Sequence, residues 1–354
     1  MIRRVAAALL GLLILGAPGS LLATSFSPYP DNASPITSGM IEVHLRALQI
    51  QAFRDEGTQL MDGTPIGSGT ATGSSGALLR RAELSASGRV APMVRYLVVA
   101  DLAAESSPII RDALIDLGST PMFTLRVGQF RIPFGIETQL PSYALPFVNR
   151  MVATFLSEQP DEIPGFLQEW DQGVELYGEP ISGPLNLAYA LAVINGNGLN
   201  EDDTNSAKDV VGRIGLRLAG FQLGASWYRG KQQDVSLVDQ TRNRAGWDIE
   251  FNPNPLKALL IRGELISGDD GSIGHRGWYL LAAYTIADRW TPAARVERWD
   301  PDRSAASDAI TRTTLGVTYA LADHTALSAN YEFRSDDAHP GVDNLAVAQL
   351  QVTF

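Results

Sequence analysis

Seven arginines on the polar side of an alternating pattern are the residues whose type and spacing point most directly to a chemical role. Around each of them apolar and polar side chains alternate, so that every second residue shares one face of an extended strand. A guanidinium group stays charged at any working pH, and its planar fork matches the oxygens of phosphate and carboxylate groups. Such side chains along a water-filled passage would attract small anions. They are Arg81, Arg126, Arg131, Arg213, Arg217, Arg244 and Arg262.

Carboxylates and further arginines share this polar face, and they leave a second interpretation open. Acidic residues nearly match the arginines in number, so the two kinds of charge could pair across neighbouring strands and cancel each other. The sequence does not choose between a positive field and a paired wall. The other charged residues expected on this face are Glu83, Arg95, Asp101, Glu175, Asp248, Glu250, Glu264, Arg295, Glu297, Arg312 and Glu332.

The sequence gives little support for a hydrolytic enzyme or for a metal site. The histidines are His44, His275, His324 and His339, and none lies in a recognisable serine-histidine motif. The acidic clusters at 201–203, 269–270 and 336–337 lack the spacing of a calcium-binding loop. The chain has no cysteine, which excludes disulfides and thiolate metal sites. We therefore expect no catalytic residue, no metal site and no cofactor, and an enzyme remains the weaker alternative.

The amino terminus predicts export. Arg3 and Arg4 precede an apolar run, Val5–Ala17, and small residues follow up to Ala23. This run is shorter than the roughly 20 residues that a membrane-spanning helix needs. We expect residues 1–23 to be a signal peptide that is cleaved after export through the Sec route. Residues 24–38, rich in Ser, Pro and Thr, are expected to form a flexible periplasmic lead-in.

The overall charge argues against a nucleic-acid partner. The chain has 39 acidic and 28 basic residues, for a net charge of −11. Proteins that bind a phosphate backbone usually present a basic surface instead. The lysines are Lys208, Lys231 and Lys257, so arginine carries almost all of the positive charge.

From residue 39 onward the chain alternates in blocks of about ten residues, and turn residues separate the blocks. Both features are typical of tilted strands that cross a bilayer. Connections alternate between short (88–92, 118–121, 180–184, 219–220, 253–255, 288–290, 322–324) and long (54–76, 131–170, 196–208, 231–243, 301–309, 335–344). We therefore predict that residues 39–354 form an all-β protein, a transmembrane antiparallel up-and-down β-barrel of about sixteen strands.

Aromatic and terminal residues favour the same class. Leu350, Val352 and Phe354 alternate with polar residues, and an aromatic last residue resembles the assembly signal of bacterial outer-membrane barrels. Aromatic residues near strand ends could form two girdles at the membrane interfaces. They are Tyr96, Phe123, Trp278, Tyr284, Trp290, Trp299, Tyr319, Tyr331 and Phe333.

The connection 131–170 is much longer than the others and contains several prolines and aromatic residues. A loop of this length in a compact fold is usually functional. We expect it to fold inward against the barrel wall and to form the constriction, although an external flap is the alternative. The residues expected there are Arg131, Glu137, Tyr143, Phe147 and Arg150.

Two stretches carry a family resemblance. LRVGQFRIPFG (Leu125–Gly135), followed by Glu137, and WDQGVELYG (Trp170–Gly178) with GPLNLAYALAVINGNG (Gly183–Gly198) resemble the phosphate-selective porin O and P family. The resemblance implies a 16-stranded homotrimeric porin of the bacterial outer membrane. It also implies an inward-folded third loop and a basic lumen that attracts phosphate.

These features together predict a non-enzymatic, water-filled channel for passive diffusion of small hydrophilic solutes, with selectivity for anions or phosphate as the finer expectation. The expected partners are outer-membrane lipid, lipopolysaccharide and small anions or other small hydrophilic solutes. A structural or adhesive outer-membrane barrel with a plugged lumen is the rival from another class.

Overall fold

The computed structural model describes residues 42–55, 74–103, 109–155, 169–233, 238–253, 258–306, 308–337 and 344–353. The expected signal peptide (1–23) and lead-in (24–38) lie outside these residues. None of the helices among the described residues is long and apolar enough to cross a membrane.

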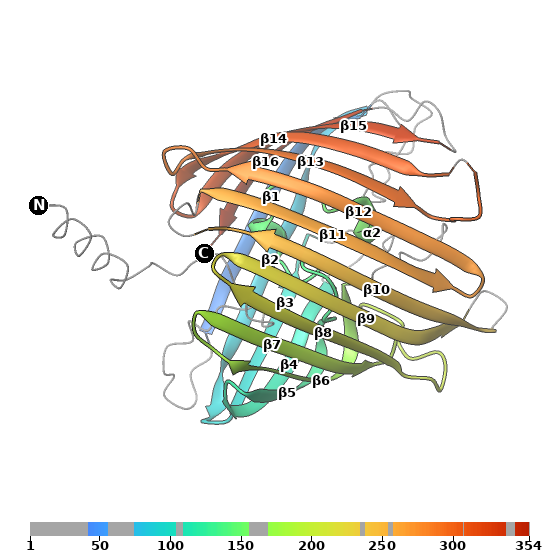
Figure 1. Ribbon diagram of the computed structural model, residues 1–354. Coiled ribbons are helices and arrows are strands. Elements are labelled where there is room, and N and C mark those ends of the chain that lie inside the picture. Colours follow the sequence, from blue (N-terminus) through green and yellow to red (C-terminus); the bar gives the residue numbers. More distant parts are fainter. Residues whose placement is uncertain are drawn as a thin grey trace, which may run out of the picture.

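Sixteen antiparallel strands form a closed barrel in which each strand pairs with its sequence neighbours and β1 pairs with β16 (Figure 1). The predicted fold class is confirmed. The strands are β1 Glu42–Asp55, β2 Ser74–Ala91, β3 Val94–Asp101, β4 Ile109–Thr120, β5 Phe123–Arg131, β6 Trp170–Ile181, β7 Leu185–Ile194, β8 Asp209–Leu218, β9 Phe221–Gln233, β10 Asp239–Phe251, β11 Leu259–Asp270, β12 Ile273–Tyr284, β13 Trp290–Asp300, β14 Ile310–Ala322, β15 Thr325–Asp336 and β16 Leu345–Thr353. Two short helices, η1 Ser142–Ala144 and α2 Val152–Phe155, lie between β5 and β6.

The alternation of residue types separates the two faces of the wall. On β13, Arg295 and Glu297 are buried inside, whereas Val296 is exposed outside. The outer face is a belt of exposed apolar side chains, among them Leu125, Val174, Leu191, Ile214, Leu223, Ile249, Leu280, Leu315 and Leu350. Hydrocarbon can cover this belt without leaving polar groups unsatisfied, because closure pairs all strand edges.

Short turns lie at the barrel end where the C-terminus is found (Figure 1). In the two-residue β8–β9 turn, Ala219 has φ 50° and Gly220 has φ 84°. Positive φ at both central residues is the turn geometry that matches the twist of a hairpin.

Two expectations about the connections are wrong. Residues 231–243 are not one long loop, because Lys231 pairs with Thr241 and Gln233 with Asp239 in the continued β9–β10 ladder. The paired residues 231–233 and 239–243 are polar, so their sequence lacks the apolar–polar alternation while the backbone ladder continues. Arg131 and Trp170 are also not loop residues, since they form the last cross-strand pair of β5 and β6.

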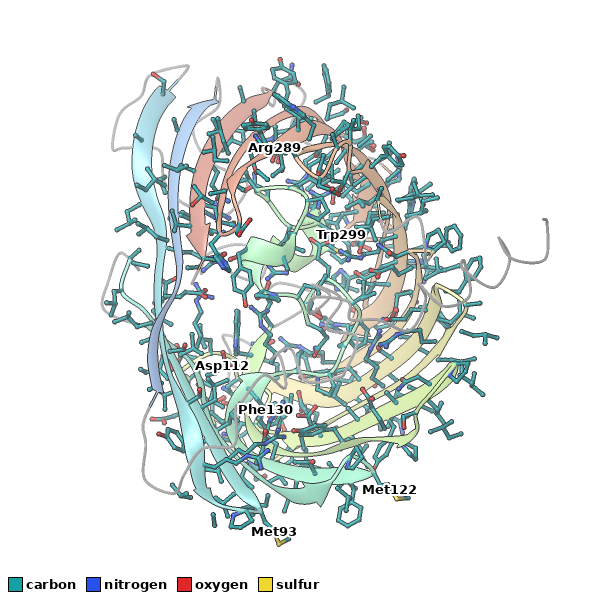
Figure 2. All side chains as sticks on the ribbon, turned by 90° about the vertical axis from the view of Figure 1, so that its left-hand side faces the viewer. Met93, Asp112, Met122, Phe130, Arg289 and Trp299 are labelled. Carbon is teal, nitrogen blue, oxygen red and sulfur yellow. The ribbon has the colours of Figure 1, made fainter. Side chains whose placement is uncertain are left out.

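The main apolar cluster lies inside the barrel, where the 132–169 connection meets the wall. It contains Phe130, Ile132, Phe134, Phe147 and Met151, together with side chains of the inner face. Figure 2, a view along the barrel from the short-turn end, shows residues 132–155 of this connection within the ring of strands; Asp112 and Phe130 lie on the inner side of the ring. Trp299, expected in a girdle, is buried inside and stacks on His275 at 5.8 Å between ring centroids.

Candidate functional site

The charged inner face is arranged by strand register. Asp116 on β4, Arg126 on β5 and Glu175 on β6 occupy one row, and Glu297 on β13 faces Arg312 on β14. All five side chains are buried. Because side chains directly opposite on neighbouring strands lie about 5 Å apart, the register brings opposite charges into contact.

Arg126 is the centre of the first row. Its Nε lies 2.8 Å from Asp116 Oδ1, and its Nη1 lies 3.1 Å from Glu175 Oε2. Nη2 also donates to the Tyr177 hydroxyl at 3.2 Å, and the guanidinium lies 4.6 Å from the centroid of that ring. The charge of Arg126 is therefore matched by two carboxylates.

The other arginines expected to attract anions lie on the same inner face, and most have carboxylate partners. Ion pairs join Arg81 to Asp101 (3.2 Å), Arg131 to Glu169 (2.9 Å), Arg213 to Asp248 (2.5 Å), Arg244 to Asp270 (2.6 Å) and Arg262 to Glu250 (2.7 Å). Arg217 is half-buried, and Glu179 and Glu250 are the carboxylates that interact with it electrostatically. These ion pairs agree with the paired wall, one of the two interpretations that the sequence left open.

The third loop, residues 132–169, is attached first to β9 and β11. The Gly135 amide donates to Ser226 Oγ at 3.0 Å, and the amides of Ile136 and Glu137 donate to Glu264 Oε1, the latter at 3.2 Å. Gly135 has φ +67°, and a Cβ at this position would lie 2.9 Å from Glu264 Oε1. Glycine therefore allows both the turn and the close approach to the carboxylate.

A second set of contacts holds the loop against β13, β14 and β15. The Val148 amide donates to Asn330 Oδ1 at 2.8 Å, and the Val152 amide donates to Glu297 Oε2 at 2.9 Å. Arg295 Nη2 donates to the Asn149 carbonyl at 3.1 Å. Side chains of the wall thus satisfy backbone groups that the irregular loop cannot pair within itself.

Inward-facing glycines make room for the apolar side of the loop. A Cβ on Gly246 of β10 would lie 2.9 Å from Phe134 Cε1, and one on Gly316 of β14 would lie 3.0 Å from Phe147 Cε1. The wall therefore has a shape complementary to the loop as well as polar groups that bind its backbone.

The carboxylate of Glu169, the last residue of the loop, pairs with two arginines. Glu169 Oε2 lies 2.9 Å from Arg131 Nη1, and Glu169 Oε1 lies 2.6 Å from Arg150 Nε. Burial opposes ionisation of Glu169, but Arg150 and Arg131 outweigh it and lower its pKa below the ordinary value. Burial and the neighbouring Arg131 lower the pKa of Arg150 to about 10, so this arginine remains charged at neutral pH.

The predicted constriction residues have different surroundings. Tyr143 is half-buried, and its carbonyl accepts from Gln351 Nε2 at 3.0 Å on β16. Phe147 is buried, and the Arg295 guanidinium of β13 lies 5.1 Å from the centroid of its ring. Glu137 accepts from the Met151 amide at 2.7 Å, and Arg150 donates to the carbonyls of Glu137 and Leu140. Phe147, Glu137 and Arg150 thus stabilise the loop itself.

Sequence reasoning missed the role of the wall carboxylates as loop anchors. Glu264, Glu297 and Glu332 were expected only as inward-facing charges, yet each accepts a hydrogen bond from the third loop. The available signal was glycine at inward positions such as 246 and 316, which indicates a close neighbour inside the barrel. Among the described residues, no group of three or more His, Cys, Asp or Glu side chains could hold a metal ion.

A closed sixteen-stranded barrel with an apolar outer belt and a charged interior crossed by a loop is the architecture of an outer-membrane channel. The model of the Gram-negative porin family matches residues 167–352, more than half of the chain. The chain therefore belongs to the Gram-negative porin family. No match was found among curated proteins.

Solved structures support the fold. An anion-selective porin from Comamonas acidovorans has a TM-score of 0.66 at 13% identity, over 89% of this chain and 99% of the other. OmpF of Salmonella typhi has a TM-score of 0.63 at 12% sequence identity, over 89% of this chain and 97% of the other. The outer-membrane channel DcaP of Acinetobacter baumannii has a TM-score of 0.63 at 12% sequence identity, over 91% of this chain and 100% of the other.

Proposed function

We propose that this porin is a water-filled channel for passive diffusion of small hydrophilic solutes, with fixed charges that are largely balanced along the lumen. The observation that carries the proposal is the pairing of inward-facing arginines with carboxylates, as at Arg126, Arg213 and Arg262. A balanced wall keeps the passage hydrated but gives it only a weak preference for one sign of ion.

Selectivity for anions, including phosphate, is the second candidate. Two guanidinium groups share the carboxylate of Glu169, because Arg131 Nη1 lies 2.9 Å from Oε2 and Arg150 Nε lies 2.6 Å from Oε1. The similarity to an anion-selective porin agrees with this candidate. Arg131 and Arg81 would then be the residues that attract the anion.

We also propose that the chain assembles as a homotrimer and that its first 23 residues are removed as a signal peptide. A structurally similar protein, OmpT of Vibrio cholerae, was solved in a trimer form, with a TM-score of 0.57 at 12% identity. The mass of the protein purified from outer membranes would test the cleavage, and its mass in mild detergent would test the trimer.

Single-channel recording in a planar bilayer tests the main proposal. We expect steady conductance in potassium chloride and a small reversal potential across a salt gradient. Absence of conductance in a correctly folded, heat-modifiable protein would favour the adhesive barrel with a plugged lumen. A large reversal potential toward anions would favour the second candidate, and the same measurement in phosphate would rank phosphate against chloride.

A further inference from the structure

Uncharged hydrogen-bonding side chains form a continuous row on the inner face of β13 to β16, which are neighbours in the barrel (Figure 1). Thr291 of β13 is opposite Thr318 of β14 in register. Ser328 of β15 is opposite both Thr318 and Gln349 of β16. Each lies an even number of residues from a buried inward residue of its strand, as Ser328 does from Glu332. Neighbouring strands are about 4.8 Å apart, so this neutral row (Thr291, Thr318, Ser328 and Gln349) spans roughly 14 Å.

The wall around the neutral row carries no charge. Elsewhere on the short-turn side of the third loop the wall is charged, as where Arg262 of β11 pairs with Glu250 of β10 at 2.7 Å. Near the row, no charged residue occurs at the short-turn ends of β12 to β16, in the segments 282–287, 291–294, 318–322, 325–329 and 349–353. An ion therefore meets no charge of opposite sign there, whereas a neutral polar solute meets hydrogen-bonding groups.

The hydroxyl groups of the row use only part of their hydrogen-bonding capacity. Thr318 Oγ1 lies 2.9 Å from Ser328 Oγ, and Thr291 Oγ1 lies 3.0 Å from Oγ1 of Thr285, which follows β12. One O–H donates in each pair, so the second O–H and further acceptor positions can serve a solute. Thr291, Thr318 and Ser328 are half-buried, so part of each side chain is open to the interior of the barrel.

The row leads to the third loop at its β16 end. Gln349 Nε2 donates to Gln351 Oε1 at 3.3 Å, and Gln351 Nε2 donates to the Tyr143 carbonyl at 3.0 Å. Strands of such barrels are tilted by about 35–45°, so a row that crosses them also advances along the passage. The uncharged groups thus extend from Thr291, next to a short turn, to the loop.

We propose that the neutral row, together with Gln351, is a weak binding track for neutral polyhydroxylated solutes such as sugars, an inference that rests on the proposed diffusion channel. Sugar hydroxyl groups donate and accept at the same time, as do the side chains of Ser, Thr and Gln. Such a solute can exchange hydrogen bonds with water for several bonds along the row. Several weak contacts favour passage, because conduction requires binding that still permits release.

Single-channel recording in potassium chloride with maltotriose tests the track. Maltotriose should interrupt the current of the wild type for longer than polyethylene glycol of about the same mass, which has few hydroxyl groups. The double variant Thr318→Val with Ser328→Ala removes both partners of one hydrogen bond and nearly keeps their shape, so the barrel should fold. It should shorten the maltotriose interruptions by about threefold or more, the effect of losing one ordinary hydrogen bond.

The double variant Ser85→Ala with Ser87→Ala is the matched control, because it removes two inward-facing hydroxyl groups of β2, outside the row. It should keep the wild-type interruptions. Ser328→Asp adds a charge to the row and should move the reversal potential toward cations, since the row faces the passage.

Three results would overturn the track while the channel proposal stands, provided that the wild type conducts steadily. They are equal interruptions by maltotriose and polyethylene glycol, equal interruptions in the two double variants, and an unchanged reversal potential in Ser328→Asp. Absence of conductance in the folded wild type would reject the channel and the track together.

Discussion

Two walls of this barrel use the same inward-facing pattern of charge in different ways. On β2 to β6, arginines pair with carboxylates of neighbouring strands, as Arg126 does with Asp116 and Glu175. On β11 to β15, Glu297 and Arg295 also pair with each other but in addition hold backbone groups of the third loop. The Arg126 row joins neighbouring strands, whereas Glu297 and Arg295 also support the loop.

This difference suggests that the width of the passage and its ion selectivity depend on different parts of the wall. Residues of the β11–β15 wall should control the width of the passage, because they hold the loop. Residues of the β2–β6 wall should control its selectivity. Variants of the two walls therefore test whether width and selectivity change independently.

Removal of the loop segment that contacts the β11–β15 wall should have the largest effect. Deleting Tyr143–Ala153 should raise single-channel conductance strongly, since this segment lies inside the barrel (Figure 2). Deleting Asp202–Asn205, in an exposed connection, is the control and should leave conductance unchanged. Equal conductance of the Tyr143–Ala153 deletion and wild type would place the narrowest point elsewhere.

Neutralising Arg126 should change selectivity on the opposite wall. Arg126→Gln leaves Asp116 and Glu175 without this partner, so the reversal potential should move toward cations. The shift should be larger at 0.01 M salt, where the Debye length is about 30 Å, than at 1 M, where it is about 3 Å.

The double variant Arg126→Gln with Glu175→Gln is the control for charge balance, and it should recover most of the wild-type reversal potential. Conductance should change little in either variant. A strong rise in conductance would mean that Arg126 also supports the loop.

Filling an inward glycine should loosen the loop by packing rather than by charge. Gly246→Val would crowd Phe134, and overpacking typically costs about 1–3 kcal/mol. We expect noisier and higher conductance with unchanged reversal potential. Adding Phe134→Ala to this variant removes the crowded ring and should quieten the current. If the double variant is as noisy as Gly246→Val, the disturbance comes from the strand and not from the loop.

Acid should have the smallest effect, through Glu169. Its pKa is lowered from the ordinary 4.5, so its stabilisation of the loop is complete above that value and is lost as pH falls through the lower value. Conductance should therefore rise below about pH 4.5. Glu169→Gln cannot titrate and should show a smaller acid-dependent change. An identical pH profile for Glu169→Gln and wild type would assign the acid effect to other carboxylates.

The sequence alone determined the architecture of the barrel. Alternation in blocks such as Phe221–Tyr228 specified strands with one apolar face, and turns such as Ala219–Gly220 specified where hairpins close. These signals are local, because side-chain period and turn conformation depend on residues close together in the chain. They also placed Arg126, Arg213 and Arg262 on the inner face.

Only the tertiary structure decided which charges meet. Arg213 and Asp248 are 35 residues apart, and Glu297 reaches the loop amide of Val152 across 145 residues. Such pairs depend on the register of the closed barrel and on the path of the third loop, which no local pattern encodes. The same period-two pattern produced a row of ion pairs between strands at Arg126 and a support for the loop at Glu297 and Arg295, because the loop backbone comes within hydrogen-bond distance of those two side chains.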